Sequence, residues 1–517
     1  MSFLTLSNIL STAASVVPDR KAVVTDRNTL TYFQLDRRAT AIAHDLLSRG
    51  HTSGEHIAIH SRNSTEWIEI FYAILKIGAI PININYRYLD DELKYIYKDS
   101  ISTCSFVSLD YFPALLRICP ELTHLRTIIP IDTNYEEIAN SDNLSELPQI
   151  NSNNLYILYT GGTTGMPKGV VWRQSDLIHA AMNAYRGHRP IVSLDQLAEE
   201  IQQSPNYPKF MAVGPLMHGT SQWMMGTCFL SGGTFTIYTD KSFSAHSVLS
   251  LLEYSQSDSL CLVGDAMASP FINALQENTN NYDLSSLFLI TNAAAPVSSN
   301  NRNKIKQLLP NVILLDSYGS SELGSIGSSF DSDVKLPTFN LNENINVFDS
   351  DNKPCPLGHV GKLARTGYIP LGYWNDSIKT SEMFFHYNNQ SWLYSGDWAI
   401  LETDNKITLL GRGSICINSG GEKIYPEEVE HYIKLYPNIS DAIVCGVPDL
   451  KWGQLVCALV VADQSFDTED LQEFLRNKIS SYKIPKKIYI VSTIQKTESC
   501  KPDYSWAIET ISSLIFN

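Results

Sequence analysis

A segment rich in glycine, threonine and lysine lies at residues 159–169, where the sequence reads YTGGTTGMPKG directly after a strand-like run. Glycines allow close backbone approach, so that consecutive N–H groups can converge on an anion. Hydroxyls and one ammonium group add further donors, and the segment therefore predicts a polyphosphate-binding loop. Its expected ligand residues are Thr160, Gly161, Gly162, Thr163, Thr164, Gly165 and Lys168. A P-loop NTPase is excluded, because that motif requires Ser or Thr directly after the lysine, where this chain has Gly169.

Four more motifs follow in order: TNAAAP at 291–296, DSYGSSELG at 316–324, YSGDW at 394–398 with GRGS at 411–414, and KTESCKPDY at 496–504. Together they resemble the adenylate-forming superfamily of acyl- and aryl-CoA synthetases, luciferases and peptide-synthetase adenylation domains. The resemblance covers nearly the whole chain. It implies that the protein is an AMP-forming ligase that binds ATP.

The resemblance also assigns roles to the nucleotide-binding residues. It implies that Tyr318 packs on adenine, that Ser321 contacts the phosphate region with the hydroxyl that threonine usually supplies, and that Glu322 helps to bind Mg²⁺. The small turn at Ala294 and Ala295 would let the purine lie against the backbone.

The remaining roles concern the ribose and the reacting groups. Asp397 would bind the ribose hydroxyls, and Arg412 would reach the ribose or the α-phosphate through its planar fork of donors. His218 occupies the position beside nucleotide and substrate and is predicted to be catalytic together with Glu322. Lys501 would bridge the substrate carboxylate and the α-phosphate in the transition state.

These residues imply a reaction in two steps. A carboxylate attacks the α-phosphate of Mg·ATP, pyrophosphate leaves, and a thiol then attacks the acyl-adenylate and releases AMP. In the family a small C-terminal lid rotates between the steps. On this chain its second surface would include Gly420 and Gly421, which line a narrow tunnel for pantetheine.

Two positions depart from the family pattern. Ser414 stands where many relatives carry aspartate or lysine at the pivot of the lid. Cys500 replaces the glycine that precedes the catalytic lysine, which would cost about 1–2 kcal/mol if that position has positive φ. We expect the hinge to work with altered rate and adenylation to be slower or sensitive to thiol modification.

The segment after the strand at 209–214 is expected to line the acyl pocket, with Leu216, Met217, His218, Gln222, Trp223 and Met224. No aspartate stands where an amino group would be bound, which favours a hydrophobic carboxylic acid over an amino acid. The sequences TGGTTGMPKGVVWR and GSICINSGGEKIYPEEVE resemble fatty-acid and steroid-side-chain CoA synthetases.

Three hypotheses stay open at this point. The acyl acceptor is coenzyme A, or it is the phosphopantetheine of an acyl or peptidyl carrier protein. The 3′-phosphate of coenzyme A or an acidic carrier would meet the basic lid residues Arg476, Lys478, Lys483, Lys486 and Lys487. The third hypothesis is a nucleotide-binding protein without catalytic activity. The intact set of Lys168, Glu322, Asp397, Arg412 and Lys501 argues against it.

The composition narrows the function classes further. The chain has 517 residues, 44% hydrophobic, and 39 basic against 54 acidic side chains give a net charge of −15, which disfavours nucleic-acid binding through a basic surface. The nine scattered cysteines indicate reduced, mostly buried thiols. There is no signal-peptide pattern and no long apolar run, so we expect a cytoplasmic protein, with a homodimer left open.

The pattern of elements predicts the fold class. Strand-like runs at 155–160, 209–214, 234–238, 259–264, 287–291 and 312–317 alternate with helical segments such as 175–187, 246–255 and 301–309. Such alternation predicts an α/β protein with mixed, mostly parallel sheets. A compact α+β pattern follows residue 411. We therefore expect an AMP-binding domain at 1–411, a hinge at 412–414 and a mobile lid at 415–517.

Overall fold

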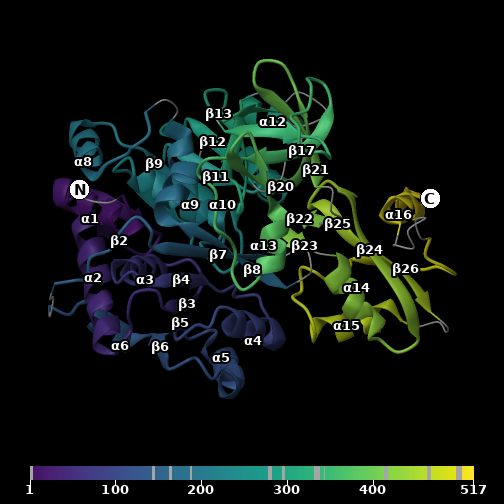
Figure 1. The fold of residues 1–517 in the computed structure, drawn as a ribbon, viewed down its shortest axis with the longest axis horizontal. Coiled ribbons are helices and arrows are strands. Elements are labelled where there is room, and N and C mark those ends of the chain that lie inside the picture. Colours follow the sequence, from purple (N-terminus) through teal and green to yellow (C-terminus); the bar gives the residue numbers. More distant parts are fainter. Residues whose placement is uncertain are drawn as a thin grey trace.

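A long mixed sheet lies at the centre of the N-terminal part in this computed structural model (Figure 1). The structure describes residues 4–142, 146–161, 166–186, 189–277, 282–293, 297, 299–330, 338–342, 344–412, 417–424, 426–462, 467–495 and 503–516. The strand order in this sheet is β16-β17-β20-β21-β15-β14-β13-β12-β11-β9-β10-β1-β2, and β19 pairs with β20 at one side.

One half of this sheet is parallel, as the alternating pattern predicts. It comprises β1 (Lys21–Val24), β9 (Lys209–Ala212), β10 (Thr234–Ile237), β11 (Ser259–Leu262), β12 (Leu289–Asn292) and the start of β13 (Ile313–Ser320), with β2 (Thr29–Thr31) antiparallel at the edge. Helices α10 (Ala245–Ser255), α11 (Gly264–Glu277) and α12 (Ser299–Leu308) connect these strands. Their apolar side chains pack on the sheet; Phe271 and Leu249 are fully buried.

The other half is antiparallel and was not singled out by the pattern. It comprises β14 (Gly324–Ser329), β15 (Thr338–Leu341), β16 (Ile345–Phe348), β17 (Val360–Arg365), β19 (Phe384–Tyr387), β20 (Gln390–Leu401) and β21 (Lys406–Arg412). Several of these strands follow one another through short turns, which suffice for antiparallel pairing. The pairing in the sheet changes from parallel to antiparallel at β13, which pairs with β14 in the antiparallel direction.

Two smaller sheets complete the N-terminal part. One is parallel, with β3 (His56–His60), β4 (Ile80–Asn83), β5 (Cys104–Ser108) and β6 (Thr127–Ile131). The other is antiparallel, with β7 (Leu155–Gly161), β8 (Pro167–Arg173) and β18 (Gly372–Tyr373). Around them lie α1 (Leu6–Val16), α2 (Tyr32–Ser48), α3 (Thr65–Lys76), α4 (Asp90–Asp99), α5 (Phe112–Ile118), α6 (Thr133–Ala139), α8 (Leu194–Gln203), α9 (Gly219–Phe229) and α13 (Ser377–Met383).

The helix expected at 175–187 differs from the expectation. It begins at Gln174 as α7 (Gln174–Leu177), widens into a π-helix at Ile178–Met182 and tightens into a 3₁₀ helix at Asn183–Arg186. Ser175 therefore lies in the first turn of the helix, and Arg173 occupies the N-cap position. The wide turns place the carbonyl of Ala180 where Arg365 Nη1 donates a hydrogen bond of 3.2 Å.

The C-terminal part has its own sheet and core. The sheet contains β22 (Ile417–Ser419), β23 (Glu422–Ile424), β24 (Ile439–Asp449), β25 (Gly453–Ala462) and β26 (Lys487–Ile490), with α14 (Pro426–Lys434), α15 (Thr468–Arg476) and α16 (Tyr504–Phe516) around it. Figure 1 shows this part, in yellow and yellow-green, at the side of the molecule next to α4 and α13. The predicted hinge falls largely on residues outside the described ranges, so the domain limits stay a prediction.

Two further findings concern the whole described chain. No described helix combines the length and apolarity that a membrane crossing requires. The cysteines of the described ranges are free thiols, and most are buried.

Candidate nucleotide and acyl-transfer site

The β7–β8 hairpin holds both ends of the predicted phosphate loop. Thr160 pairs with Lys168 and Gly161 with Pro167, so the two ends of the predicted loop lie side by side. Between them, Gly162, Thr163, Thr164 and Gly165 lie outside the described ranges and stay predictions. Lys168 is 9% exposed. The hairpin thus holds a nearly buried amine at the base of the loop.

Asn83 anchors this hairpin and was not predicted from the sequence. Its side-chain amide accepts a hydrogen bond from the Tyr159 N–H at 2.9 Å and donates to the Tyr159 carbonyl at 2.9 Å and the Met217 carbonyl at 2.7 Å. One side chain therefore connects the strand before the phosphate loop with the segment before His218. A buried polar residue at the end of the apolar strand β4 was the available signal.

The turn between β13 and β14 carries Glu322 and lies against the same hairpin. Trp172 Nε1 donates to the Ser321 carbonyl at 3.0 Å, and Tyr373 OH donates to Glu322 Oε1 at 3.1 Å. Tyr373 also lies between Glu322 and Lys168, whose Nζ is 5.2 Å from the centre of the Tyr373 ring. The predicted phosphate ligand and the predicted Mg²⁺ ligand are therefore brought together.

The predicted adenine and ribose residues also meet. Tyr318 OH donates to Asp397 Oδ2 at 2.5 Å, although the two residues come from β13 and β20. Asp397 is 6% exposed, and its backbone N–H donates to Ser395 Oγ at 2.8 Å. Arg412 is the direct neighbour of Asp397 in the β20–β21 ladder. Three predicted nucleotide-binding residues thus converge from three strands.

The turn Gly420–Gly421 of the C-terminal part packs on the N-terminal part. Both residues have positive φ, +60° and +84°. A Cβ on Gly421 would come within 2.3 Å of Val263 Cγ1, and one on Gly420 within 2.9 Å of the Trp452 ring. Only glycine fits these two positions, because both the φ angles and the short Cβ distances exclude a side chain. The predicted lid turn can therefore approach the N-terminal part closely.

Glu422, directly after this turn, forms a polar contact between the two parts. It pairs with Arg87, and its Oε1 is 3.5 Å from His218 Nε2. Burial acts to raise the pKa of Glu422, but the nearby His218 and Arg87 outweigh it and lower the pKa to about 2. His218 lies at the N-terminus of α9 with 41% of its side chain exposed. The histidine therefore faces the lid in this arrangement.

The amine of Lys168 has an unusual environment. Burial and, after it, the neighbouring Lys379 lower its pKa to about 8, while Asp376 and Glu322 act to raise it. Removing an ammonium group from water disfavours its charged form unless an anion is close. An amine with a pKa of about 8 is mostly protonated at neutral pH, so Lys168 meets phosphate as a cation, and a bound phosphate would stabilise that charge.

Several residues expected in the acyl pocket belong to the packed core. Leu216 is fully buried and Gln222 is 3% exposed. Gln222 accepts from Tyr156 OH at 2.7 Å and donates to the Leu216 carbonyl at 2.8 Å, so its polar atoms are used within the fold. Trp223 and Met224 pack against the same core at partial burial.

Other predicted residues fall outside the described ranges. These are Lys501, the preceding Cys500, the hinge Ser414, and the small turn residues Ala294 and Ala295. Nearby, Asn292 donates to Asp316 Oδ1 at 3.1 Å and accepts from the Gly264 N–H at 2.9 Å. These contacts hold the strand ends that flank the turn.

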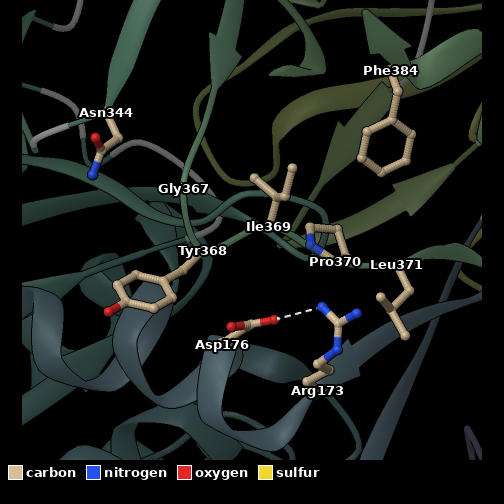
Figure 2. A pocket seen from close by; sticks show the side chains of 9 residues that line it. All are labelled: Arg173, Asp176, Asn344, Gly367, Tyr368, Ile369, Pro370, Leu371 and Phe384. Carbon is tan, nitrogen blue, oxygen red and sulfur yellow. Dashed lines mark hydrogen bonds and ion pairs between the residues drawn. The ribbon is translucent and has the colours of Figure 1, made fainter. Parts of the chain in front are cut away.

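A surface cavity of about 470 Å³ lies apart from this cluster (Figure 2). An exposed ion pair between Arg173 and Asp176, 3.2 Å apart, forms one wall, and the stretch Gly367–Leu371 forms another. Tyr368 at its edge stacks on His179, with ring centres 4.4 Å apart. None of the predicted site residues lines it.

Comparison with known proteins decides the family. A family model described as AMP-binding enzyme matches residues 10–374, and one described as AMP-binding enzyme C-terminal domain matches residues 428–501. The chain belongs to the AMP-binding enzyme family. It is 36% identical to a 3-oxocholest-4-en-26-oate–CoA ligase of Rhodococcus rhodochrous, over 98% of this chain and 95% of that protein.

Further relatives agree with this assignment. A medium/long-chain-fatty-acid–CoA/3-oxocholest-4-en-26-oate–CoA ligase of Mycolicibacterium smegmatis is 34% identical over 98% of this chain and 96% of that protein. Among solved structures, the amide bond synthetase McbA of Marinactinospora thermotolerans has a TM-score of 0.80 at 20% identity, with 98% of this chain and 99% of that chain covered. The predicted family, fold class and enzyme class, an acyl-CoA ligase, are thereby confirmed.

Proposed function

We propose that this member of the AMP-binding family activates a hydrophobic carboxylic acid with ATP and transfers the acyl group to coenzyme A. The observation that carries the proposal is the convergence of Lys168, Glu322, Tyr318 and Asp397, which come from three separate segments of the chain and meet around one hairpin and one sheet. A phosphate-binding amine, a carboxylate and a ribose-binding pair are the groups that adenylation needs.

The first step forms a bond between a carboxylate oxygen of the acid and the α-phosphorus of ATP. The bond to the bridging oxygen breaks, and its electron pair leaves with pyrophosphate. Lys168 neutralises phosphate charge, while Tyr318, Asp397 and Arg412 hold the nucleoside. Lys501 aligns the carboxylate with the α-phosphate, so positioning and charge neutralisation supply the catalysis.

Mg²⁺ fits this donor set as an ion that accompanies ATP. It prefers oxygen ligands in octahedral geometry and commonly takes only one or two protein carboxylates, with phosphates and water completing the shell. Glu322 supplies such a carboxylate beside Lys168. Bound there, Mg²⁺ would neutralise charge on the phosphates.

In the second step the thiol of coenzyme A attacks the acyl carbon of the adenylate, and AMP leaves with the electron pair of the broken carbon–oxygen bond. The turn Gly420–Gly421 supports this assignment through its position, because its close packing on Val263 brings the C-terminal part against the N-terminal part. His218 and Glu422 lie at the same junction. We infer that the structure has the lid in the orientation for thioester formation.

The substrate acid is proposed to be a medium- or long-chain fatty acid or a sterol side-chain acid. The names of the relatives support this class, and the apolar surroundings of the segment 210–224 are compatible with it. The cytoplasmic location and a homodimer remain proposals from the sequence.

Acid-dependent release of AMP, measured with and without coenzyme A over a panel of fatty, aromatic and sterol-derived acids, tests the proposal. We expect release to require a hydrophobic acid and to accelerate with micromolar coenzyme A. Acceleration by a pantetheinylated carrier protein alone would identify the other acceptor. No acid-dependent exchange of labelled pyrophosphate into ATP over the whole panel would indicate a protein without this activity.

A further inference from the structure

Helix α13 lies beside the predicted phosphate-binding lysine because of a short strand pairing. In β18, Gly372 pairs with Val171 and Tyr373 with Val170 of β8, and the Trp374 N–H donates to the Gly169 carbonyl at 2.8 Å. The chain then enters α13 only four residues after Tyr373. The first turn of α13 is thereby held next to the end of β8 that carries Lys168.

The first turn of α13 is rigidly attached to this strand. Asp376 caps the helix by accepting from the Lys379 N–H at 3.0 Å, and Thr380 Oγ1 accepts from the Tyr373 N–H at 2.9 Å. At Gly372, a Cβ would come within 2.3 Å of Thr380 Cγ2. The backbone at Lys379 is therefore fixed relative to Tyr373 and Lys168.

The side chain of Lys379 reaches Lys168. The two amines are close enough for their mutual repulsion to contribute, after burial, to the lowered pKa of Lys168. Lys379 Nζ is 3.6 Å from Asp376 Oδ2, whereas Glu322 is engaged by Tyr373 OH. Two neighbouring amines at the end of β8 form a place where a multiply charged anion is stabilised.

We propose that Lys379 is a second phosphate-binding residue, which together with Lys168 holds the β- and γ-phosphates of ATP and then the pyrophosphate leaving group. This inference rests on the proposed adenylation. When the α-phosphorus–oxygen bond breaks, the negative charge that appears on the departing bridging oxygen is spread over pyrophosphate, and two ammonium groups stabilise it. Lys379 thereby assists departure without giving up a proton.

The test compares Lys379→Ala and Lys379→Arg with the wild-type protein, using an acid that the wild type activates. Lys353→Ala, at an exposed position outside the site, is the matched control. We expect Lys379→Ala to raise both the KM for ATP and the inhibition constant of inorganic pyrophosphate by about 10-fold. Lys379→Arg should restore most of the pyrophosphate affinity, and Lys353→Ala should match the wild type.

A pH profile separates phosphate binding from a structural role. In the wild type, kcat/KM for ATP should fall above pH about 8 as Lys168 loses its proton. Without Lys379 the repulsion is gone, so the alkaline limb should move to higher pH even though affinity is lower. Damage to the fold would lower kcat/KM at every pH without changing the pH at which kcat/KM begins to fall.

The outcomes distinguish this inference from the proposed function. If the wild type catalyses acid-dependent pyrophosphate exchange but Lys379→Ala has unchanged pyrophosphate inhibition and an unmoved alkaline limb, the assignment of Lys379 is wrong. If no acid supports exchange by the wild type, the proposed adenylation fails first. Thioester formation from supplied acyl-adenylate, which needs no pyrophosphate, should be the same in all variants.

Discussion

The ammonium group of Lys483, in the C-terminal part, lies 2.5 Å from Oε1 of Glu92, in helix α4 of the N-terminal part. Their side chains are 5% and 3% exposed, and Ser480 Oγ donates to Glu92 Oε2 at 3.0 Å. This burial and pairing correct the expectation that Lys483 is one of the basic lid residues that meet the acyl acceptor. A buried ion pair thus connects the two parts in this lid orientation.

Glu92→Gln should slow thioester formation from supplied acyl-adenylate by 10-fold or more, because loss of one partner from a buried ion pair costs about 3–5 kcal/mol. Adenylation, which uses the other lid orientation, should change much less. Single-turnover assays of each half-reaction measure the effect.

Glu121→Gln is the matched control for this variant, since Glu121 pairs with Lys94 of the same helix at 2.9 Å but is 51% exposed. Exposed pairs contribute about 0–1 kcal/mol, so no change is expected. Equal slowing of both half-reactions by Glu92→Gln would contradict a role specific to one orientation.

The acid stability of the contact between the two parts should depend on Glu422. The pKa of Glu422 is about 2 in the folded protein and 4.5 ordinarily. Since the folded value is the lower one, the stabilisation is complete above pH 4.5 and is lost as the pH falls toward about 2. The difference in melting temperature between wild type and Glu422→Gln should therefore shrink over this interval. A constant difference from pH 6 to pH 3, a range of about three units, would contradict it.

Asp397→Ala should raise the KM for ATP by 10-fold or more, because hydrogen bonds to a charged group contribute about 1.5–3 kcal/mol. Tyr318→Phe removes the hydroxyl of the 2.5 Å contact and should have a smaller effect in the same direction. Equilibrium binding of ATP checks both. Unchanged ATP affinity in Asp397→Ala would remove Asp397 from the nucleotide site.

Gly421→Ala should block thioester formation, since the added Cβ would meet Val263 and the lid turn could not seat. Gly358→Ala provides the control: its φ of +77° is equally unfavourable for alanine, but nothing lies within 4 Å of the Cβ position. Thioester assays from acyl-adenylate separate steric blockage from backbone strain. Equal activity of the two variants would contradict this seating.

Lys501→Ala should impair the other half-reaction, which is adenylation. We expect it to abolish formation of the adenylate and to leave thioester formation from supplied acyl-adenylate largely intact, because the lysine acts only on the phosphate step. Pyrophosphate exchange and thioester assays on the same preparation measure this. Loss of both activities would contradict a lid that alternates between two orientations.

The motifs predicted candidate site residues whose chemistry is visible in the local sequence, and the roles of these residues stay predictions. Gly161, Lys168 and Asp397 stand beside recognisable neighbours, and strand–helix alternation predicted the parallel half of the long sheet. Asn83 and Tyr373 were missed, because each acts through contacts with segments that lie far away in the sequence. The burial of Lys483 was missed for the same reason: a lysine that pairs across two parts looks like any surface lysine.

The single amide of Asn83 links the strand entering the phosphate loop to the main chain at Met217. Remodelling residues 215–218 to accommodate a different acid would therefore also shift the support of the triphosphate-binding hairpin. Diversification of acid preference in this protein is accordingly expected to proceed through side chains around that stretch, with its backbone path retained.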